Sequence, residues 1–245
     1  MKKFQECKIL GVNINVMNMN DVVEYIEDNI QNLKGKYICV SNVHTTVMSY
    51  ENPQYKDVQN NAILRLPDGK PLSVVQRKRG FKNASRVTGP DLMKVLFEHS
   101  NSNLKHYFFG STDETLSKLE YHLKLNYPKL DICGLYSPPF RKLTPKEDEE
   151  IIKKINNSGA NILWVGLGAP KQENWMFEHM NKINALMIGV GAGFDYHAGN
   201  IKRAPKWMQK CSLEWLYRLM QDPKRLFGRY IKTNFKFIWL IFRGK

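Results

Sequence analysis

The stretch NILWVGLGAPKQE, residues 161–173, carries the pattern that decides the fold. A short apolar run, Asn161–Val165, is followed by two glycines, Gly166 and Gly168, and then by a polar segment that can begin a helix. Apolar runs of this length that end at glycine are typical of strands buried on both faces. A buried strand that leads through glycines into a helix is the repeating unit of a parallel sheet.

The same unit recurs along the chain. Further apolar runs predict strands at Lys8–Val12, Tyr37–Ser41, Ile63–Leu66, Lys105–Phe109, Asp131–Leu135 and Ala185–Val190. Apolar residues at helical spacing predict helices over Asp21–Leu33, Asp91–Glu98, Asp113–Leu125 and Pro145–Ile155. Helix N-termini are indicated by the capping residue types of Asn20, Thr112 and Thr144. This alternation predicts an α/β fold, a Rossmann-like and mainly parallel sheet with helices on both faces.

The composition changes near Gly199–Pro205. We expect an α/β core over residues 1–200, followed by a basic, aromatic-rich helical C-terminal appendage over residues 201–245. The appendage holds twelve Lys or Arg residues against Glu214 and Asp222, which gives it +10 of the chain's net charge of +14. Cations mixed with aromatic and aliphatic groups suit an anionic membrane surface. On charge alone, nucleic acid is an equal rival, and a solvated basic face is the third interpretation.

Other sequence features limit the class of protein. No apolar run is long enough to cross a bilayer, and we expect no signal peptide. The four cysteines form no C-x-x-C pair, which favours small reduced thiols over zinc ligands: Cys7, Cys39, Cys133 and Cys211. The sequence therefore predicts an intracellular protein that can lie on a membrane without crossing it.

Ligands of parallel sheets bind beyond the carboxyl ends of the strands, so the residues after each predicted strand are the candidate site. Glycine-bearing turns follow three strands, at Gly110, at Gly166–Gly168 and at Gly191–Gly193. None of them matches a dinucleotide fingerprint or a Walker A motif. One such turn is more often a tight loop than a phosphate cradle, whereas several at one edge favour a nucleotide-type ligand. The Pro67-Asp68-Gly69 turn, taken alone, is most simply an Asx turn.

Taken together, nine segments resemble the WecG/TagA/CpsF family of bacterial glycosyltransferases. In the order in which the family has them, they are Ser41–Thr46, Leu66–Gly69, Arg86–Leu92, Tyr107–Gly110, Val165–Glu173, Gly189–Asp195, Arg203–Pro205, Glu214–Leu219 and Pro223–Leu226. The resemblance covers nearly the whole chain. Its most specific parts are the Lys171-Gln172-Glu173 and Glu214–Arg218 segments.

The resemblance implies an inverting transfer of a hexose from a UDP-sugar to a polyprenyl-diphosphate-linked saccharide. It places this reaction at the cytoplasmic face of the cell membrane, in teichoic acid, capsule or exopolysaccharide synthesis. N-acetylmannosamine is the expected sugar, and UDP-glucose or another UDP-hexose is the alternative donor. The implied partner of the appendage is then an anionic membrane surface and not nucleic acid. The oligomeric state stays open, a homo-oligomer included.

The resemblance also assigns roles to residues. It makes Asp68 the base that takes the proton of the acceptor hydroxyl. The chain contains no Asp-x-Asp motif, so neither a metal ion nor another cofactor is implied. Arg218, Arg225 and Arg229 are then the candidates to stabilise the departing UDP, with Arg218 and Arg225 as the catalytic pair, and a lipid-facing cationic surface is their simpler interpretation. Substrate contacts are expected from Asn42, Thr45, Arg86, Gly110, Gly166, Gly168, Lys171, Gln172, Gly191, Asp195 and Arg229.

Simpler interpretations stand beside several of these assignments. Asn42 and Thr45 can be helix caps, and Arg86 can be a surface cation. Gln172 can be merely solvated, and Asp195 can hold the backbone of its own loop. Two other classes of protein also stay open. One is a different nucleotide-binding enzyme such as a methyltransferase, although this chain has no acidic residue at the end of the second strand, which counts against it. The other is a non-enzymatic membrane or nucleic-acid adaptor, which only the basic aromatic appendage supports.

Overall fold

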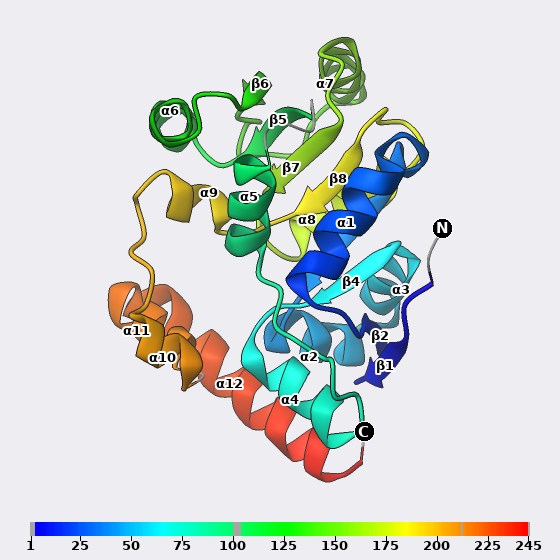
Figure 1. Cartoon of the computed structure of the whole chain (residues 1–245), viewed down its shortest axis with the longest axis vertical. Helices are drawn as coiled ribbons and strands as arrows, with labels where there is room; N and C mark the ends of the chain where they lie inside the picture. The colour runs from blue at the N-terminus through cyan, green and yellow to red at the C-terminus, as the bar shows by residue number, and fades with distance from the viewer. Residues whose placement is uncertain (1–2, 100–103, 212, 245) are drawn as a thin grey trace.

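The fold is built on a six-stranded sheet, as the computed structural model shows (Figure 1). The structure describes residues 3–99, 104–211 and 213–244, except for the side chains of Lys206, Lys210, Arg225 and Arg229. The strand order is β4-β3-β8-β7-β5-β6, and every pairing within this sheet is parallel. The strands are β3 (Tyr37–Ser41), β4 (Leu64–Pro67), β5 (Lys105–Gly110), β6 (Asp131–Tyr136), β7 (Ile162–Gly166) and β8 (Leu186–Gly189). The predicted parallel sheet is confirmed.

The predicted strand at Lys8–Val12 is wrong. A hairpin of β1 (Glu6–Ile9) and β2 (Val12–Asn15) takes its place and forms a separate two-stranded antiparallel sheet. The turn uses positive φ angles of 48° at Leu10 and 88° at Gly11. Glycine enters this region without steric cost, so the chain reverses in the middle of what reads as one apolar run.

The helices alternate with the strands. Those of the core are α1 (Met19–Asn29), η1 (Ile30–Leu33), α2 (Val43–Glu51), α3 (Pro53–Asn61), α4 (Lys70–Lys78), α5 (Gly89–Glu98), α6 (Asp113–Asn126), α7 (Pro145–Asn157), α8 (Lys171–Glu178) and α9 (Gly193–His197). The side chains of Thr112 and Thr144 cap α6 and α7 as predicted. The cap predicted at Asn20 is wrong, because Asn18 caps the helix instead. The Asn18 side chain accepts from the Asp21 amide, and the Asp21 carboxylate accepts from the Asn18 amide.

Both faces of the sheet are covered. Ile38, Phe108 and Trp164 point to a core shared with α1, α5 and α6. Their neighbours along the same strands point to the opposite face, where they pack against α7 and α8: Tyr37, Cys39, Tyr107, Phe109, Leu163 and Val165. Successive strand residues face opposite sides, so a strand buried on both faces needs the continuous apolar runs seen in the sequence.

The C-terminal appendage forms α10 (Lys206–Lys210), α11 (Glu214–Gln221) and α12 (Pro223–Phe242). Figure 1 shows α12 running beside α4 and α2, with its last turn near the β1–β2 hairpin. Phe237 and Leu240 of α12 are buried in one cluster with Val47 of α2 and with Leu72 and Val75 of α4. Part of the appendage is therefore packed into the molecule. Within the described residues, no helix combines the length and the apolar character that a bilayer crossing requires.

Candidate active site

Two neighbouring strands bring the first site residues together. Ser41 of β3 pairs with Pro67 of β4, so Asn42 and Asp68, the next residues of each chain segment, emerge at the same edge of the sheet. The Asp68 amide donates to the Ser41 carbonyl at 2.7 Å, which fixes the start of the turn. Gly69 then adopts a φ of +86° and the chain enters α4. Asp68 is thereby held, half-buried, at the carboxyl edge.

A second backbone contact brings Arg86 within electrostatic reach of Asp68. The Val87 amide donates to the Pro67 carbonyl at 3.0 Å, so the segment before α5 runs along β4. Thr88 caps α5 and donates to Asp91 Oδ2 at 2.6 Å, and Arg86 Nη2 lies 3.3 Å from the same oxygen. The surface-cation interpretation of Arg86 is therefore wrong, since its guanidinium group belongs to a partly buried ion-pair cluster.

The appendage closes this cluster. Arg86 Nη1 donates to Glu214 Oε2 of α11 at 2.5 Å, a contact between residues 128 positions apart. Arg203 Nη2 donates to Asp91 Oδ1 at 2.7 Å, and its Nε lies 3.7 Å from Glu214 Oε1. An arginine of the core thus pairs with an acid of the appendage, and an arginine of the appendage pairs with an acid of the core. Because these pairs are partly buried, they fix geometry better than exposed pairs do.

Arg218 follows Glu214 by one helical turn, so both side chains lie on the same face of α11. Its guanidinium group lies 5.8 Å from the ring centroid of Tyr196. Its Nε is buried and makes no hydrogen bond to any residue that the structure describes. Buried polar groups are nearly always paired, and guanidinium groups pair best with carboxylates and phosphates. The unused donor therefore suits an anionic ligand.

Asp68 is tuned by these neighbours. Burial raises the pKa of its carboxyl to about 6, and the charges of Glu214 and Asp91 act in the same direction. The guanidinium groups of Arg86 and Arg218 oppose the rise in this pKa. A carboxylate with a pKa near the working pH is a stronger base than an ordinary one and is still mostly ionised at neutral pH. The electrostatics suit a general base.

The glycines of the predicted rim divide into two kinds. A Cβ on Gly110 would lie 2.6 Å from the backbone of Gly166, and one on Gly166 would lie 2.8 Å from the Phe194 ring. These two glycines permit close packing, which agrees with the interpretation of their turns as tight loops. Gly168 and Gly191 have φ angles of +76° and +55°, and a Cβ there would meet nothing within 4 Å. The open space beside them can hold a ligand.

Gln172 is neither solvated nor facing open space. It is buried, accepts from the Gly191 amide at 3.0 Å and donates to Glu173 Oε1 at 2.7 Å. The Glu173 carboxyl is itself buried, which raises its pKa. Gln172 thus ties the start of α8 to the loop after β8, and Lys171 beside it is exposed.

The remaining predicted residues are placed as follows. Asn42 and Thr45 form a reciprocal capping box at the start of α2, which is the helix-cap interpretation. Asp195 Oδ1 accepts from Asn200 Nδ2 at 3.3 Å. Arg225 and Arg229 lie in α12, but their side chains are outside what the structure describes.

Three contributors were not predicted from the sequence: Asp91, Arg203 and Tyr196. Asp91, Arg203 and Glu214 stand out in the sequence only as members of family motifs, and Glu214 also as one of two acids among the twelve cations of the appendage. That rarity was a usable indication, because a lone acid among cations is expected to have a specific partner. In the described part of the chain, no three His, Cys, Asp or Glu side chains gather closely enough to ligate one metal ion.

The comparisons with known proteins agree with one another. Residues 7–245 match the sequence model of the Glycosyl transferase WecG/TagA/CpsF family. An N-acetylglucosaminyldiphosphoundecaprenol N-acetyl-beta-D-mannosaminyltransferase from Bacillus spizizenii is 30% identical over 203 residues, 82% of this chain and 76% of that protein. The protein of the same name from Staphylococcus aureus (strain MW2) is 29% identical over 243 residues, 97% of this chain and 92% of that protein. The chain belongs to the WecG/TagA/CpsF family of glycosyltransferases.

Proposed function

We propose that this enzyme transfers N-acetylmannosamine, with inversion, from UDP-N-acetylmannosamine to N-acetylglucosaminyl-diphospho-undecaprenol. The names of the relatives support the sugar and the acceptor. The observation that carries the chemistry is that Asp68, whose pKa is raised to about 6, lies within electrostatic reach of Arg218, whose buried Nε has no hydrogen-bond partner among the described residues. One group suits proton removal from the acceptor, and the other suits charge on the leaving group.

The reaction is a single displacement at the anomeric carbon of the donor. The acceptor hydroxyl oxygen forms the new bond to this carbon while the bond to the UDP oxygen breaks. The proton of the hydroxyl passes to the Asp68 carboxylate, and UDP leaves with the bonding electron pair. Arg218 stabilises the charge that develops on the diphosphate, and we assign Arg225 and Arg229 to the same task. Attack opposite the leaving group inverts the configuration.

The donor occupies the open space beside Gly168 and Gly191 in this proposal. Gln172 serves as a positioning residue, because its two hydrogen bonds hold the Gly191 amide in place against α8. Arg86 orients Glu214, and thereby Arg218, through the contact between the core and α11. The appendage, residues 201–245, then completes the site, since it supplies a charge that the core alone lacks there.

We propose that α12 rests on the inner face of the cell membrane. Leu226, Phe237 and Leu240 are buried, whereas a second apolar stripe, about 140° around the helix from them, is exposed: Phe227, Ile231, Phe235, Ile238 and Phe242. Exposed cations such as Lys224 and Lys232 accompany this stripe. An amphipathic helix of this kind binds anionic bilayers by apolar burial and charge together.

The test is a donor screen with UDP release as the measurement. The purified enzyme is mixed with a short-chain, water-soluble N-acetylglucosaminyl-diphosphate lipid and with one UDP-sugar at a time. We expect release that needs both substrates and is fastest with UDP-N-acetylmannosamine. Faster turnover of UDP-glucose, UDP-galactose or UDP-N-acetylglucosamine would replace the sugar and keep the reaction class. UDP release that does not depend on the acceptor, with every donor tested, would contradict the proposed sugar transfer.

Membrane and nucleic acid are separated by a binding experiment. Flotation with vesicles that contain anionic lipid is compared with retention of the protein on DNA at the same salt concentration. We expect flotation to persist at a salt concentration that releases the protein from DNA, because the apolar stripe is insensitive to screening. Stronger retention on DNA than on vesicles would contradict the membrane assignment.

A further inference from the structure

One aromatic ring of the core lies against two arginines of the appendage. The ring is that of Tyr196 in α9, a helix that begins at Gly193, shortly after the turn at Gly191. The guanidinium carbon of Arg203 lies 5.1 Å from the ring centroid, and that of Arg218 lies 5.8 Å from it. Both distances are within the range of about 6 Å in which the face of an aromatic ring attracts a cation. Tyr196 therefore joins the loop after β8 to the appendage.

The core holds Tyr196 in place from both sides. Phe194, two residues earlier, is buried against Phe108, with ring centroids 5.6 Å apart. His197, the next residue, donates from Nε2 to the Pro90 carbonyl at 3.0 Å. Because an aromatic side chain rotates about only two bonds, an anchored backbone restricts where its ring can lie. The ring is thus a fixed surface of the core on which an arginine of the appendage can rest.

The two arginines on this ring are held in different ways. Arg203 Nη2 donates to Asp91 Oδ1 at 2.7 Å, and its Nε lies 3.7 Å from Glu214 Oε1. Arg218 Nε is buried and has no hydrogen-bond partner among the residues that the structure describes. A carboxylate occupies the N–H groups of an arginine and neutralises its charge, whereas an aromatic ring attracts the charge through its face. Contact with the ring therefore leaves the Nε donor and the charge of Arg218 available to a phosphate.

We propose that Tyr196 is a positioning residue for the transfer reaction: its ring holds the Arg218 guanidinium group where the diphosphate of the donor departs. The proposal rests on the proposed function, which assigns Arg218 to the leaving group. The ring acts through the arginine and takes no proton, so the hydroxyl of Tyr196 is not required. Because Tyr196 follows the turn at Gly191, one side chain also links the position of the arginine to the turn beside which we place the donor.

The experiment is a double-mutant cycle on kcat, measured as UDP release by the full chain with UDP-N-acetylmannosamine and the water-soluble acceptor. Tyr196→Leu removes the ring, and we expect kcat to fall by about 3–30-fold, the size of one cation–π contact. In an Arg218→Ala background the same change should cost less than about twofold, because the group through which Tyr196 acts is already absent. Equal losses in both backgrounds would show an effect through Arg203 or through stability and would overturn the proposal.

Conservative variants separate the ring from the fold. Tyr196→Phe keeps the aromatic face, so kcat should stay within about twofold of the parent enzyme. Tyr121→Leu makes the same change as Tyr196→Leu on an exposed ring of α6 and should also stay within about twofold. A loss in Tyr196→Phe as large as in Tyr196→Leu would assign the effect to the hydroxyl and overturn the role of the ring. Tyr196→Met, which fills more volume without an aromatic face, replaces Tyr196→Leu if urea unfolding shows that variant to be destabilised.

The cycle also distinguishes failure of this proposal from failure of the proposed function. If Arg218→Ala alone leaves kcat within a few-fold of the parent enzyme, the arginine does not stabilise the leaving group and both proposals are overturned. If Arg218→Ala lowers kcat by about tenfold or more while Tyr196→Leu has no effect, the role of Arg218 stands and only the role of Tyr196 is refuted.

Discussion

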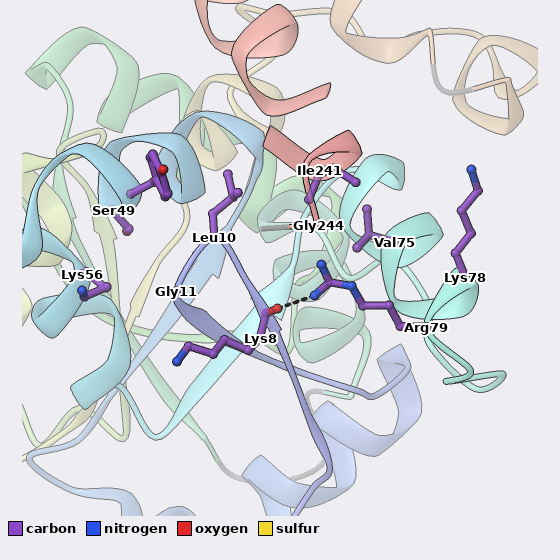
Figure 2. Close-up of a pocket in the computed structure, with 11 residues that line it drawn as sticks. Lys8, Leu10, Gly11, Ser49, Lys56, Val75, Lys78, Arg79, Ile241 and Gly244 are labelled. Atoms are coloured by element: carbon purple, nitrogen blue, oxygen red, sulfur yellow. Dashed lines mark hydrogen bonds between the residues drawn. The ribbon is translucent and has the colours of Figure 1, made fainter. Parts of the chain in front are cut away.

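The two ends of α4 can be compared, because one short helix separates a cluster of paired acids and arginines from a group of cations. At its N-terminal end, three arginines face three acids: Arg86, Arg203, Arg218, Asp68, Asp91 and Glu214. At its C-terminal end, Arg79 donates to the carbonyl of Lys8, and Lys8, Lys56 and Lys78 lie in the same surface region (Figure 2). Paired charges hold one another in place and shift a pKa, whereas a group of cations raises the local positive potential.

The helix itself favours this arrangement. Its first turn exposes unpaired amides and a partial positive charge, which suits the Asp68 carboxylate just before it. Its last turn contains Arg77 and Lys78, which suit the partial negative charge there. The comparison can be tested by substitutions in the cluster at the N-terminal end. Loss of a reacting group there should change turnover most, and loss of a neighbouring charge should change it less.

The largest effect is expected from Asp68→Asn. This change preserves shape but removes the proton acceptor, so turnover should fall by about 10²–10⁴-fold, the range for loss of a general base. UDP affinity, measured by calorimetry, should stay nearly unchanged. Turnover within a few-fold of the parent enzyme would show that another group takes the proton and that the balanced cluster serves structure alone.

Arg218→Ala should lower turnover by about 10–10³-fold, because a charge on the leaving diphosphate loses its partner. Added salt should not restore it. Lys224→Ala removes an exposed cation of α12 and should leave turnover on a water-soluble acceptor within a few-fold. Similar losses in both variants would make the arginine a general membrane contact. Substitution is preferable to removal of residues 201–245, which would also uncover the packing around Phe237 and Leu240.

The stability of the fold should change in the direction opposite to activity. Because the pKa of Asp68 is raised from 3.8 to about 6 in the folded protein, ionisation costs free energy there. The free energy of unfolding should fall as the pH rises through this window and stay lower above it. Asp68→Asn should therefore raise the free energy of unfolding at pH 8 by on the order of 1–3 kcal/mol, with no gain below pH 4. Urea unfolding at both pH values decides the point.

The neighbours of Asp68 should move its titration in opposite directions. The acid limb of kcat/KM should have a midpoint near 6, the raised pKa of Asp68. Arg86→Gln removes a cation that lowers this pKa, so the midpoint should rise. Glu214→Gln removes an anion that raises it, so the midpoint should fall, each by about one pH unit or less. Shifts in the same direction would show that the variants act through altered structure.

The smallest effect is expected from chelation. The cations of the proposed diphosphate site are guanidinium groups, so excess EDTA should leave the initial transfer rate within about twofold of the untreated enzyme, whereas loss of one charge stabiliser costs far more. Dialysed enzyme in the same buffer is the control. Activity that disappears with EDTA and returns with Mn²⁺ would show that a metal ion holds the diphosphate.

Local sequence determined most of the fold. Six strands of the parallel sheet and the caps at Thr112 and Thr144 follow from apolar runs and from side chains that bond to nearby amides. Two local errors have local causes. Leu10 and Gly11 turn within an apolar run, and Asn18 competes successfully with Asn20 because Asp21 can return its hydrogen bond. Short-range rules fail where two neighbouring residues satisfy them equally well.

The family resemblance and the strand ends pointed to Asp68 as the candidate base, but only the tertiary structure decided its environment. The contact from Arg86 to Glu214 spans 128 positions, and no periodicity within the sequence encodes it. The same holds for Gln172, whose side-chain oxygen accepts from the Gly191 amide, 19 positions along the chain. Helices and their caps are set by bonds between near neighbours along the chain, and the strands are recognisable from local apolar runs although their pairing joins distant segments. A pKa, a buried ion pair and a cavity depend on which distant side chains exclude water together, and packing alone determines that.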